Sequence, residues 1–315
     1  MLRRRLLKRL LPILLMTLWV CSWFGAAIYG QSPEALGEPT GATALNFDLS
    51  DKAPFRLQSD WVSGPENAMS ETNASAVLPI LLPFSKLPTE GSPPPLVKVG
   101  FGFTDLVSPD DFYLPSSLYE YTMNLTLIRP INERWTVIAI LGAGMATDNE
   151  NRSSDAWQFR GGILGVNKWS DRWSWTLGVI GTGRRDIPVV PAVGAVWEPN
   201  SVTRVDLTFP RPRLYRLIRQ RGEIYHWAYL GASINGTTWA YENSEIGDDQ
   251  LTYRDWRLAL GWEVQRGRNP DMSFGMGKKI GGEFGLAFAR EYEFERESRT
   301  EVLENSFFLS INTSF

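Results

Sequence analysis

Residues 304–315 read Glu-Asn-Ser-Phe-Phe-Leu-Ser-Ile-Asn-Thr-Ser-Phe, and they are the last stretch of the sequence. From here the odd positions are mostly apolar: Phe307, Leu309, Ile311, Thr313 and Phe315. The even positions are mostly small or polar: Ser306, Phe308, Ser310, Asn312 and Ser314. Successive side chains of a β-strand point to opposite faces, so a period of two predicts a strand with one apolar face.

The same alternation recurs in segments of about ten residues separated by turn-forming residues, which is typical of membrane β-barrels. In 251–264, for example, one face carries Trp256, Leu258, Leu260, Trp262 and Val264. The predicted strands are 55–63, 75–86, 96–107, 118–129, 133–145, 157–166, 172–182, 188–197, 201–209, 225–234, 237–242, 251–264, 279–292 and 304–315. The alternation is weakest in 55–63, 188–197 and 237–242, so twelve strands is the alternative count.

A terminal strand with an aromatic residue at its end resembles the C-terminal strand of bacterial outer-membrane β-barrel proteins. The resemblance implies that Phe307, Leu309, Ile311 and Phe315 present the chain to the outer-membrane insertion machinery. Phe209-Pro210 before a basic stretch also resembles uncharacterised families of predicted outer-membrane proteins. The expected fold is therefore all-β: a porin-like transmembrane antiparallel β-barrel of about 12–14 strands, with a C-terminal strand ending in Phe.

The first thirty residues are typical of a secretory signal peptide. Residues 3–9 carry five positive charges, residues 10–20 are almost wholly apolar, and small residues follow at 25–27. This order predicts a signal peptide over 1–30, a periplasmic lead-in over 31–54 and the barrel over 55–315. An uncleaved anchor helix is the alternative, since residues 10–28 are nearly long enough to span a bilayer. The expected location is the outer membrane of a Gram-negative bacterium.

Composition excludes several classes of protein. Hydrophobic residues make up 43% of the chain and its mean hydropathy is −0.19, which argues against a helical membrane protein. The single cysteine, Cys21, lies in the leader, so the mature chain has no thiol for disulfides, catalysis or metal binding. Loss of the five leader charges changes the formal net charge from −3 to −8, which argues against nucleic-acid binding. We expect no cofactor and no metal.

The connections between predicted strands alternate in length, as in barrels with short periplasmic turns and long outer loops. With the C-terminus in the periplasm, the short inner turns are Pro130–Asn132, Asn167–Ser170, Glu198–Asn200 and Asn235-Gly236. The Asn-Gly pair suits a two-residue hairpin. The outer loops are 64–74, 108–117, 146–156, 183–187, 210–224, 243–250 and 293–303. Two inner connections, Leu87–Pro95 and Gln265–Lys278, are longer than this rule expects.

The faces opposite the apolar ones carry charged residues, which are costly against lipid and are therefore expected in the lumen. The lumen-facing candidates are Glu120, Arg160, Arg204, Asp206, Asp255, Arg257, Glu263, Lys279 and Glu283. Such a lumen is either a solvated channel or an ion-paired plug. Aromatic residues near segment ends are expected to form the interfacial girdles: Tyr119, Trp135, Trp157, Trp173, Trp197 and Trp262.

Residues 209–221 hold five arginines: Arg211, Arg213, Arg216, Arg219 and Arg221. On this topology they lie in the longest outer loop. Arginine forks suit the phosphates of lipopolysaccharide or an anionic solute at a pore mouth, whereas the simpler interpretation is a solvated loop. Outer-membrane lipids and lipopolysaccharide are thus the expected partners.

His226 is the only histidine and therefore the one candidate for a lipid-modifying enzyme of the barrel type, in which a histidine contacts a serine nucleophile. Ser233 lies seven residues further on, more than about 20 Å along a strand. Three hypotheses follow. The first is a non-enzymatic outer-membrane barrel with a passive-pore, structural or surface role. The second is an enzyme that uses His226, and the third is a soluble periplasmic β-sandwich binding protein.

Overall fold

The computed structural model describes residues 55–64, 67–79, 94–109, 112–266 and 279–314. All of them belong to one compact unit, Ala44–Phe315. The predicted signal peptide, the lead-in, Phe315 and most of the two long connections before residues 95 and 279 lie outside the described residues. No described segment forms a helix with the length and apolarity needed to cross a bilayer.

The described residues of this unit contain fifteen strands and the short 3₁₀ helix η2 (Ser154–Ala156). The first seven strands are β1 (Phe55–Val62), β2 (Met69–Pro79), β3 (Leu96–Leu106), β4 (Ser117–Pro130), β5 (Trp135–Thr147), β6 (Trp157–Ser170) and β7 (Trp173–Gly181). The others are β8 (Val189–Asn200), β9 (Thr203–Asp206), β10 (Arg213–Arg221), β11 (Ile224–Asn243), β12 (Gly247–Arg266), β13 (Lys279–Phe294), β14 (Arg299–Leu303) and β15 (Ser306–Ser314).

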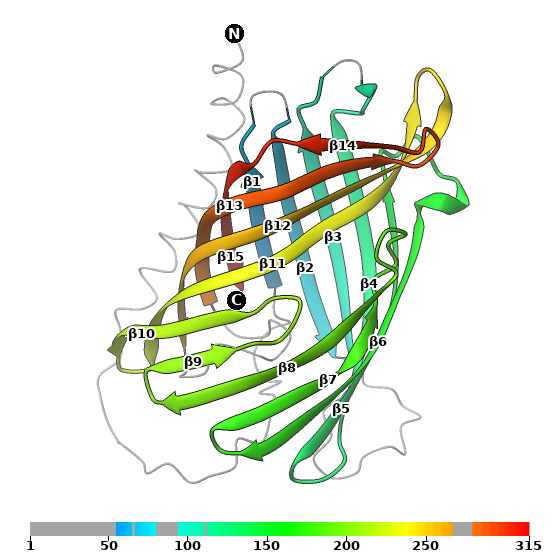
Figure 1. Ribbon diagram of the computed structural model, residues 1–315. Coiled ribbons are helices and arrows are strands. Elements are labelled where there is room, and N and C mark those ends of the chain that lie inside the picture. Colours follow the sequence, from blue (N-terminus) through cyan, green and yellow to red (C-terminus); the bar gives the residue numbers. More distant parts are fainter. Residues whose placement is uncertain (1–54, 65–66, 80–93, 110–111, 267–278, 315) are drawn as a thin grey trace. The chain divides into compact units, whose positions relative to one another are not determined.

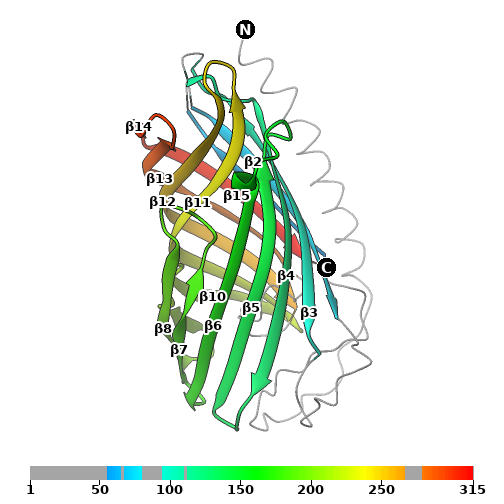
Figure 2. The ribbon, with the colours of Figure 1, turned by 90° about the vertical axis from the view of Figure 1, so that its right-hand side faces the viewer.

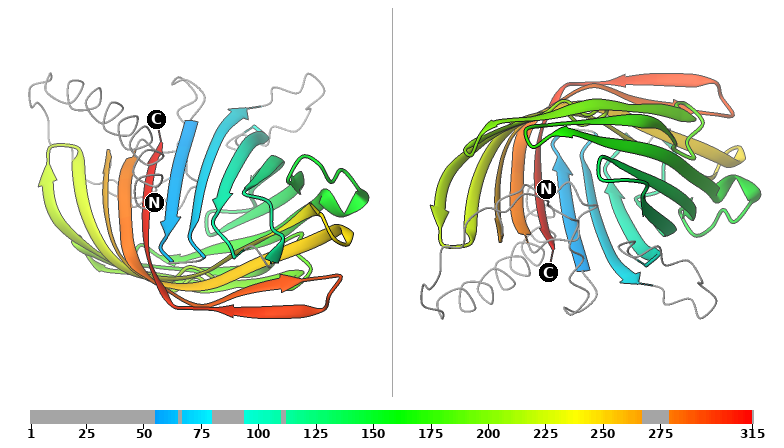
Figure 3. Two further views of the ribbon diagram at one scale, coloured as in Figure 1. Left: turned by 90° about the horizontal axis from the view of Figure 1, so that it is seen from above. Right: turned by 90° about the horizontal axis from the view of Figure 1, so that it is seen from below.

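The strands close on themselves as an antiparallel ring. Strands β1 to β13 pair in sequence order, and β15 bridges β13 back to β1. Strand β14 pairs with Arg290–Phe294 of β13, and β15 pairs with Lys279–Ala287 of the same strand. Strands β14 and β15 therefore occupy one strand position together, and the ring has fourteen strand positions. Figure 2 shows β5, β4 and β3 side by side in this order, and Figure 3 shows the ring from above and below. The predicted fold is confirmed.

Large apolar side chains cover the outward face of the wall, as the alternation predicts. In β15, Phe307 is 55% exposed and Phe308 is 1% exposed, although the two are adjacent. The tryptophans of the predicted girdles are all exposed: Trp135, Trp157, Trp173, Trp197 and Trp262. An apolar outward face with no free sheet edge is what a strand-built protein needs in hydrocarbon, which offers no hydrogen bonds.

The two ends of the barrel differ in their connections. At one end, the turn end, four connections are short, 131–134, 171–172, 201–202 and 222–223, and two are long, 80–95 and 267–278. At the other, the loop end, most connections are longer than those four, for example 107–116, 148–156 and 182–188. The loop end is uppermost in Figure 1, where β11, β12 and β13 slant up toward it. Most of the predicted alternation of short and long connections is therefore present.

Two predicted connections are wrong outright, and three outer loops overlap strands: 64–74 includes the start of β2, 243–250 includes the start of β12, and 293–303 includes β14. Asn235-Gly236 is no hairpin turn, because it lies inside β11, where it pairs with Asp255 and Arg254 of β12. The predicted outer loop 210–224 contains β10 and the turn after it. A continuous ladder of twenty paired residues between β11 and β12 outweighs the local turn preference of Asn-Gly. The two errors cancel in the strand count, since one strand was missed and another was divided. Strand β2 also begins six residues before the predicted segment 75–86.

Candidate functional site

The interior of the loop end is filled by one cluster of buried side chains. It contains the aromatic residues Trp239, Tyr241, Tyr253, Tyr292, Phe294 and Phe308. Aliphatic side chains from β1 to β4 complete it: Val62, Met69, Leu106 and Leu118. Because β4 and β11 lie on opposite sides of the ring, this cluster crosses the barrel rather than lining one wall.

Two opposite strands also contact each other directly, in what we call the seam. Ala240 of β11 forms a parallel bridge with Thr147 of β5, although β6 to β10 separate these strands in the ring. The amide of Asp148 donates to the carbonyl of Ala240 at 3.2 Å. An open lumen keeps opposite walls apart, so the seam closes the barrel at this level.

Side chains of the connection after β5 hold the seam. The Asp148 carboxylate accepts from the amide of Glu242 at 2.8 Å, and the Asn151 side-chain amide donates to the carbonyl of Tyr241 at 3.1 Å. Gln158 of β6 donates to the carbonyl of Thr238 at 2.5 Å. These three bonds give backbone groups of β11 partners from the opposite wall of the barrel.

A network of buried charge lies directly below the aromatic side chains. Arg257 pairs with Asp255 at 3.0 Å and with Asp60 of β1 at 3.4 Å, and its guanidinium lies 4.9 Å from the centre of the Phe308 ring. Arg290 is 1% exposed and donates to the carbonyls of Asn67 and Glu304, the Ser306 hydroxyl and the Tyr253 phenol. Buried charges of this kind are tolerated only where hydrogen bonds surround them.

The interior of the turn end is built differently. One apolar cluster, on β2 to β8, contains Val77, Leu96, Ile128, Ile138, Leu164 and Ala192. A second, on β10 and β11, contains Tyr215, Trp227 and Tyr229. The two are separate, so among the described residues no apolar packing joins opposite walls here. Glu283 pairs with Arg213 at 2.6 Å beside the second cluster, whereas Glu120 pairs with Arg160 at 2.5 Å nearer the loop end, where Glu120 lies opposite Ala146 of the loop-end cluster.

All nine predicted lumen-facing residues lie on the inward side of their strands, and eight of them form ion pairs. Beyond the pairs above, Arg204 contacts Glu198 at 2.7 Å and Lys279 contacts Glu263 at 3.7 Å. Asp206 is the exception, since its carboxylate accepts only from the amide of Thr208 within the described part of the chain. These contacts are those of an ion-paired interior, one of the two alternatives that the sequence left open.

The sequence-based interpretation missed Arg290. Counting from Phe284, Leu286 and Phe288 places residue 290 on the outward face. A register shift opposite Arg254 and Trp256, with Ala289 at a φ of 47°, changes the phase of β13 and turns Arg290 inward. An irregularity of this kind leaves no mark in the alternation before it, so no signal could have revealed it.

The assignment of the five arginines to one outer loop is also wrong. Arg213, Arg216, Arg219 and Arg221 belong to β10, and Arg211 directly precedes it. Arg213 points inward to Glu283, and Arg211 lies near Asn235 on the same side. Arg216, Arg219 and Arg221 are exposed, and they approach the turn end instead of the outer loops.

His226 lies on the outward face of β11, where its ring centre is 6.1 Å from that of Trp262. Its cross-strand neighbours are Arg219 and Val264. No described residue forms a hydrogen bond with it, and Ser233 points to the opposite face. The arrangement required for a histidine base beside a serine nucleophile is therefore missing from this part of the described chain.

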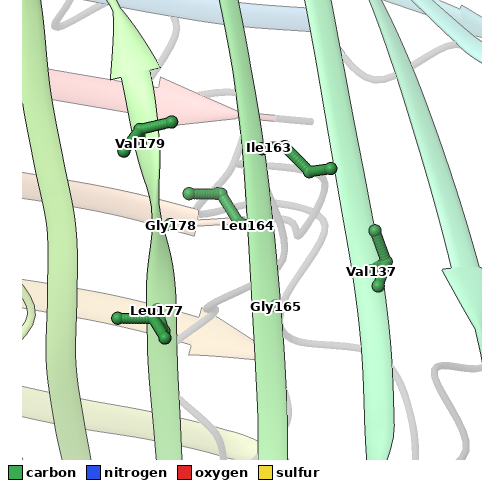
Figure 4. A pocket seen from close by; sticks show the side chains of 7 residues that line it. All are labelled: Val137, Ile163, Leu164, Gly165, Leu177, Gly178 and Val179. Carbon is green, nitrogen blue, oxygen red and sulfur yellow. The ribbon is translucent and has the colours of Figure 1, made fainter.

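A shallow recess in the outward face is lined only by apolar side chains and glycine (Figure 4). Its lining residues are Val137, Ile163, Leu164, Gly165, Leu177, Gly178 and Val179. Ile163 and Leu177 are among the most exposed apolar residues of the wall. The recess suits a hydrocarbon chain and offers no polar side chain for catalysis or recognition.

The profile of a family described as a domain of unknown function, DUF6268, matches residues 96–315. The chain belongs to this family. The DUF6268 match runs from the start of β3 to the end of the sequence and so includes twelve of the fourteen ring positions. Strands β1 and β2, which complete the ring, precede it.

Among solved structures, the chain is similar to the Pseudomonas putida toluene transporter TodX, with 9% sequence identity and a TM-score of 0.27. The alignment covers 84% of this chain and 88% of that one. A TM-score at this level supports no statement about function. No curated protein matches the sequence.

Proposed function

We propose that this DUF6268 protein is a non-enzymatic barrel of the outer membrane, closed at its loop end in the resting state, with a structural or surface role. Passive diffusion through an open pore is the weaker of the two functions considered for such a barrel. The seam between β5 and β11 supports a closed barrel over an open pore, because opposite walls that share a backbone hydrogen bond leave no passage between them.

The outward apolar face supports the membrane location. Closed barrels are one of only two architectures that satisfy every backbone group inside hydrocarbon. Four of the six connections at the turn end are short, as on the periplasmic side in barrels of this class, and this supports an orientation with the loop end and the seam at the cell surface. On this orientation the outer hairpins face lipopolysaccharide, and the C-terminal strand remains available to the insertion machinery.

Support for a non-enzymatic role comes from His226. Its neighbours Arg219, Val264 and Trp262 include no nucleophile, and its ring faces the lipid side of the wall. The enzyme hypothesis is therefore not favoured by the geometry. A soluble sandwich is not favoured either, since the ring closes and its apolar side chains point outward.

Conductance of the refolded mature chain in a planar bilayer tests the proposal. We expect the wild-type protein to insert and to remain silent. The double variant Asp148→Ala/Asn151→Ala removes two side-chain bonds that hold the seam, each worth about 0.5–1.5 kcal/mol, and we expect it to open in discrete steps. Glu150→Ala is the matched control, because Glu150 lies in the same connection and its side chain is exposed.

Circular dichroism and the heat-dependent shift in gel mobility should first show that all three proteins fold and insert. Steady conductance by the wild-type protein would contradict the closed state and restore the passive pore. Silence of the double variant alongside a silent wild type would assign closure to the aromatic cluster instead of the seam.

A further inference from the structure

We propose that Arg216, Arg219, Arg221 and Arg266 form a binding site for the phosphate groups of membrane phospholipid, on the outward wall at the turn end. The inference rests on the membrane location and orientation proposed above. It replaces the lipopolysaccharide site expected from the sequence, which needed all these arginines in an outer loop.

All four side chains project from the outward face. Paired residues of an antiparallel ladder point to the same side of a sheet. Arg216 pairs with Ala228, Arg219 with His226, and both Arg221 and Arg266 pair with Ile224. This is the face that carries the exposed Leu214 and Leu230, whereas Tyr215, Trp227 and Tyr229 occupy the inward one. The arginines thus share the surface that contacts lipid.

Their height along the wall suits a headgroup. Arg221 directly precedes the turn 222–223, and Arg266 ends β12 at the same level. Arg216 lies level with Ala228 and Trp262, one of the girdle tryptophans. Leu214, Leu230 and Leu260 continue the face toward the membrane centre. Long arginine side chains at such a boundary reach the interface while their stems cover apolar surface.

The charges of the patch are largely uncompensated. Arg266 contacts Glu223 at 2.8 Å, and both side chains are well exposed. Of the described residues, Arg216 donates only to the hydroxyl of Thr203, at 2.8 Å. Among the described residues, neither Arg219 nor Arg221 has an acidic partner. Within the described residues, these four guanidinium groups have one carboxylate partner, that of Glu223. Several pairs of guanidinium N–H donors are therefore left without an acidic partner, and such pairs match the paired oxygens of a phosphate.

Phospholipid is the occupant that fits this position. The patch faces the bilayer and lies at the turn end, where the proposed orientation puts the inner leaflet. Each basic residue near a charged membrane surface contributes about 1 kcal/mol of attraction. A soluble anion would instead favour arginines directed into the lumen, such as Arg213, which Glu283 already neutralises.

Lipid retention measured by native mass spectrometry tests the site. The variant Arg216→Gln/Arg219→Gln/Arg221→Gln removes three charges from the patch. The matched control, Arg129→Gln/Arg134→Gln/Arg172→Gln, removes three charges from the end of β4 and from two other turns at the same end of the barrel. After detergent exchange with phosphatidylglycerol, we expect the patch variant to retain about one-tenth or less of the wild-type lipid. The control should remain within about twofold of the wild type.

Three further measurements separate the possible outcomes. Diacylglycerol, which lacks phosphate, should bind all three proteins equally weakly. Displacement of the lipid by millimolar inorganic phosphate would overturn the proposal in favour of a site for a free anion, as would equal losses in both triple variants. Flotation with phospholipid vesicles reports insertion separately, so a barrel that floats but retains no phosphatidylglycerol contradicts this site and leaves the membrane location standing.

Discussion

The interior of the barrel is filled in different ways at its two ends. At the loop end, one buried cluster draws on opposite walls, and the backbones of β5 and β11 meet. At the turn end, two small clusters of described residues remain on their own walls, and the pair of Glu283 with Arg213 lies beside one of them. The sequence shows one alternation throughout, so the difference arises from which inward residues are large.

Closure is therefore a matter of side-chain volume and not of strand number. Inward positions of the loop end carry Tyr241, Tyr253, Tyr292 and Phe294, which fill the cross-section as side chains fill a protein core. Inward positions of the turn end include many glycines and short polar residues. If this comparison is right, equivalent substitutions should cost much more at the loop end than at the turn end.

Substitution of an interior arginine gives the largest expected difference. Arg290→Met leaves buried acceptors at Asn67, Glu304 and Ser306 without a donor, and we expect a loss of about 3 kcal/mol or more of unfolding free energy. Arg213→Met at the turn end leaves Glu283 partly exposed, with the Tyr229 hydroxyl still donating to it. We expect a smaller loss there, of about 1–3 kcal/mol.

Guanidinium-induced unfolding in lipid vesicles, followed by tryptophan fluorescence, measures both arginine variants. Equal losses would show that the two ends are packed alike. A larger loss from Arg213→Met would reverse the comparison.

A pair of adjacent phenylalanines tests the direction of the side chains at the loop end. Phe308→Ala removes an aromatic ring from the cross-barrel cluster, and we expect a cost of about 3–5 kcal/mol. Phe307→Ala removes the same ring from the lipid-facing surface, where it stacks on Phe284, and should cost clearly less. The same unfolding measurement applies, and comparable losses would mean that the Phe308 ring is not part of a packed plug.

The success of the sequence-based interpretation has a local cause. A strand that separates lipid from interior must alternate, so the inward parity of residues such as Asp255 and Glu263 could be predicted from the pattern alone. Strand β10 was missed because three of its outward residues are arginines, which removed the apolar stripe, and because a bulge at Leu217 and Arg219 breaks its phase.

The sequence contained evidence against the predicted division of β11 into two strands. Its inward positions run without interruption through Tyr229, Asn235 and Tyr241, whereas the predicted hairpin would have started a new strand after Gly236. This continuity of phase was better evidence than the Asn-Gly pair. The seam had no such signal. Contact between β5 and β11 depends on how closely opposite walls of the closed ring approach each other, and no single segment of sequence encodes this distance.

The smallest expected effect concerns a glycine at the turn end. A Cβ on Gly261 would lie 2.1 Å from the Tyr229 ring, so Gly261→Ala must displace that ring from its position beside Glu283. Separate clusters give the ring space to move inward, and we therefore expect about 1–3 kcal/mol of destabilisation, at the lower end of that range. Gly282→Ala is the control, since its nearest neighbour would be the Ser310 carbonyl at 3.4 Å. A cost for Gly261→Ala as large as that for Phe308→Ala would mean that the turn end is as tightly packed as the loop end, and the distinction between the two ends would fail.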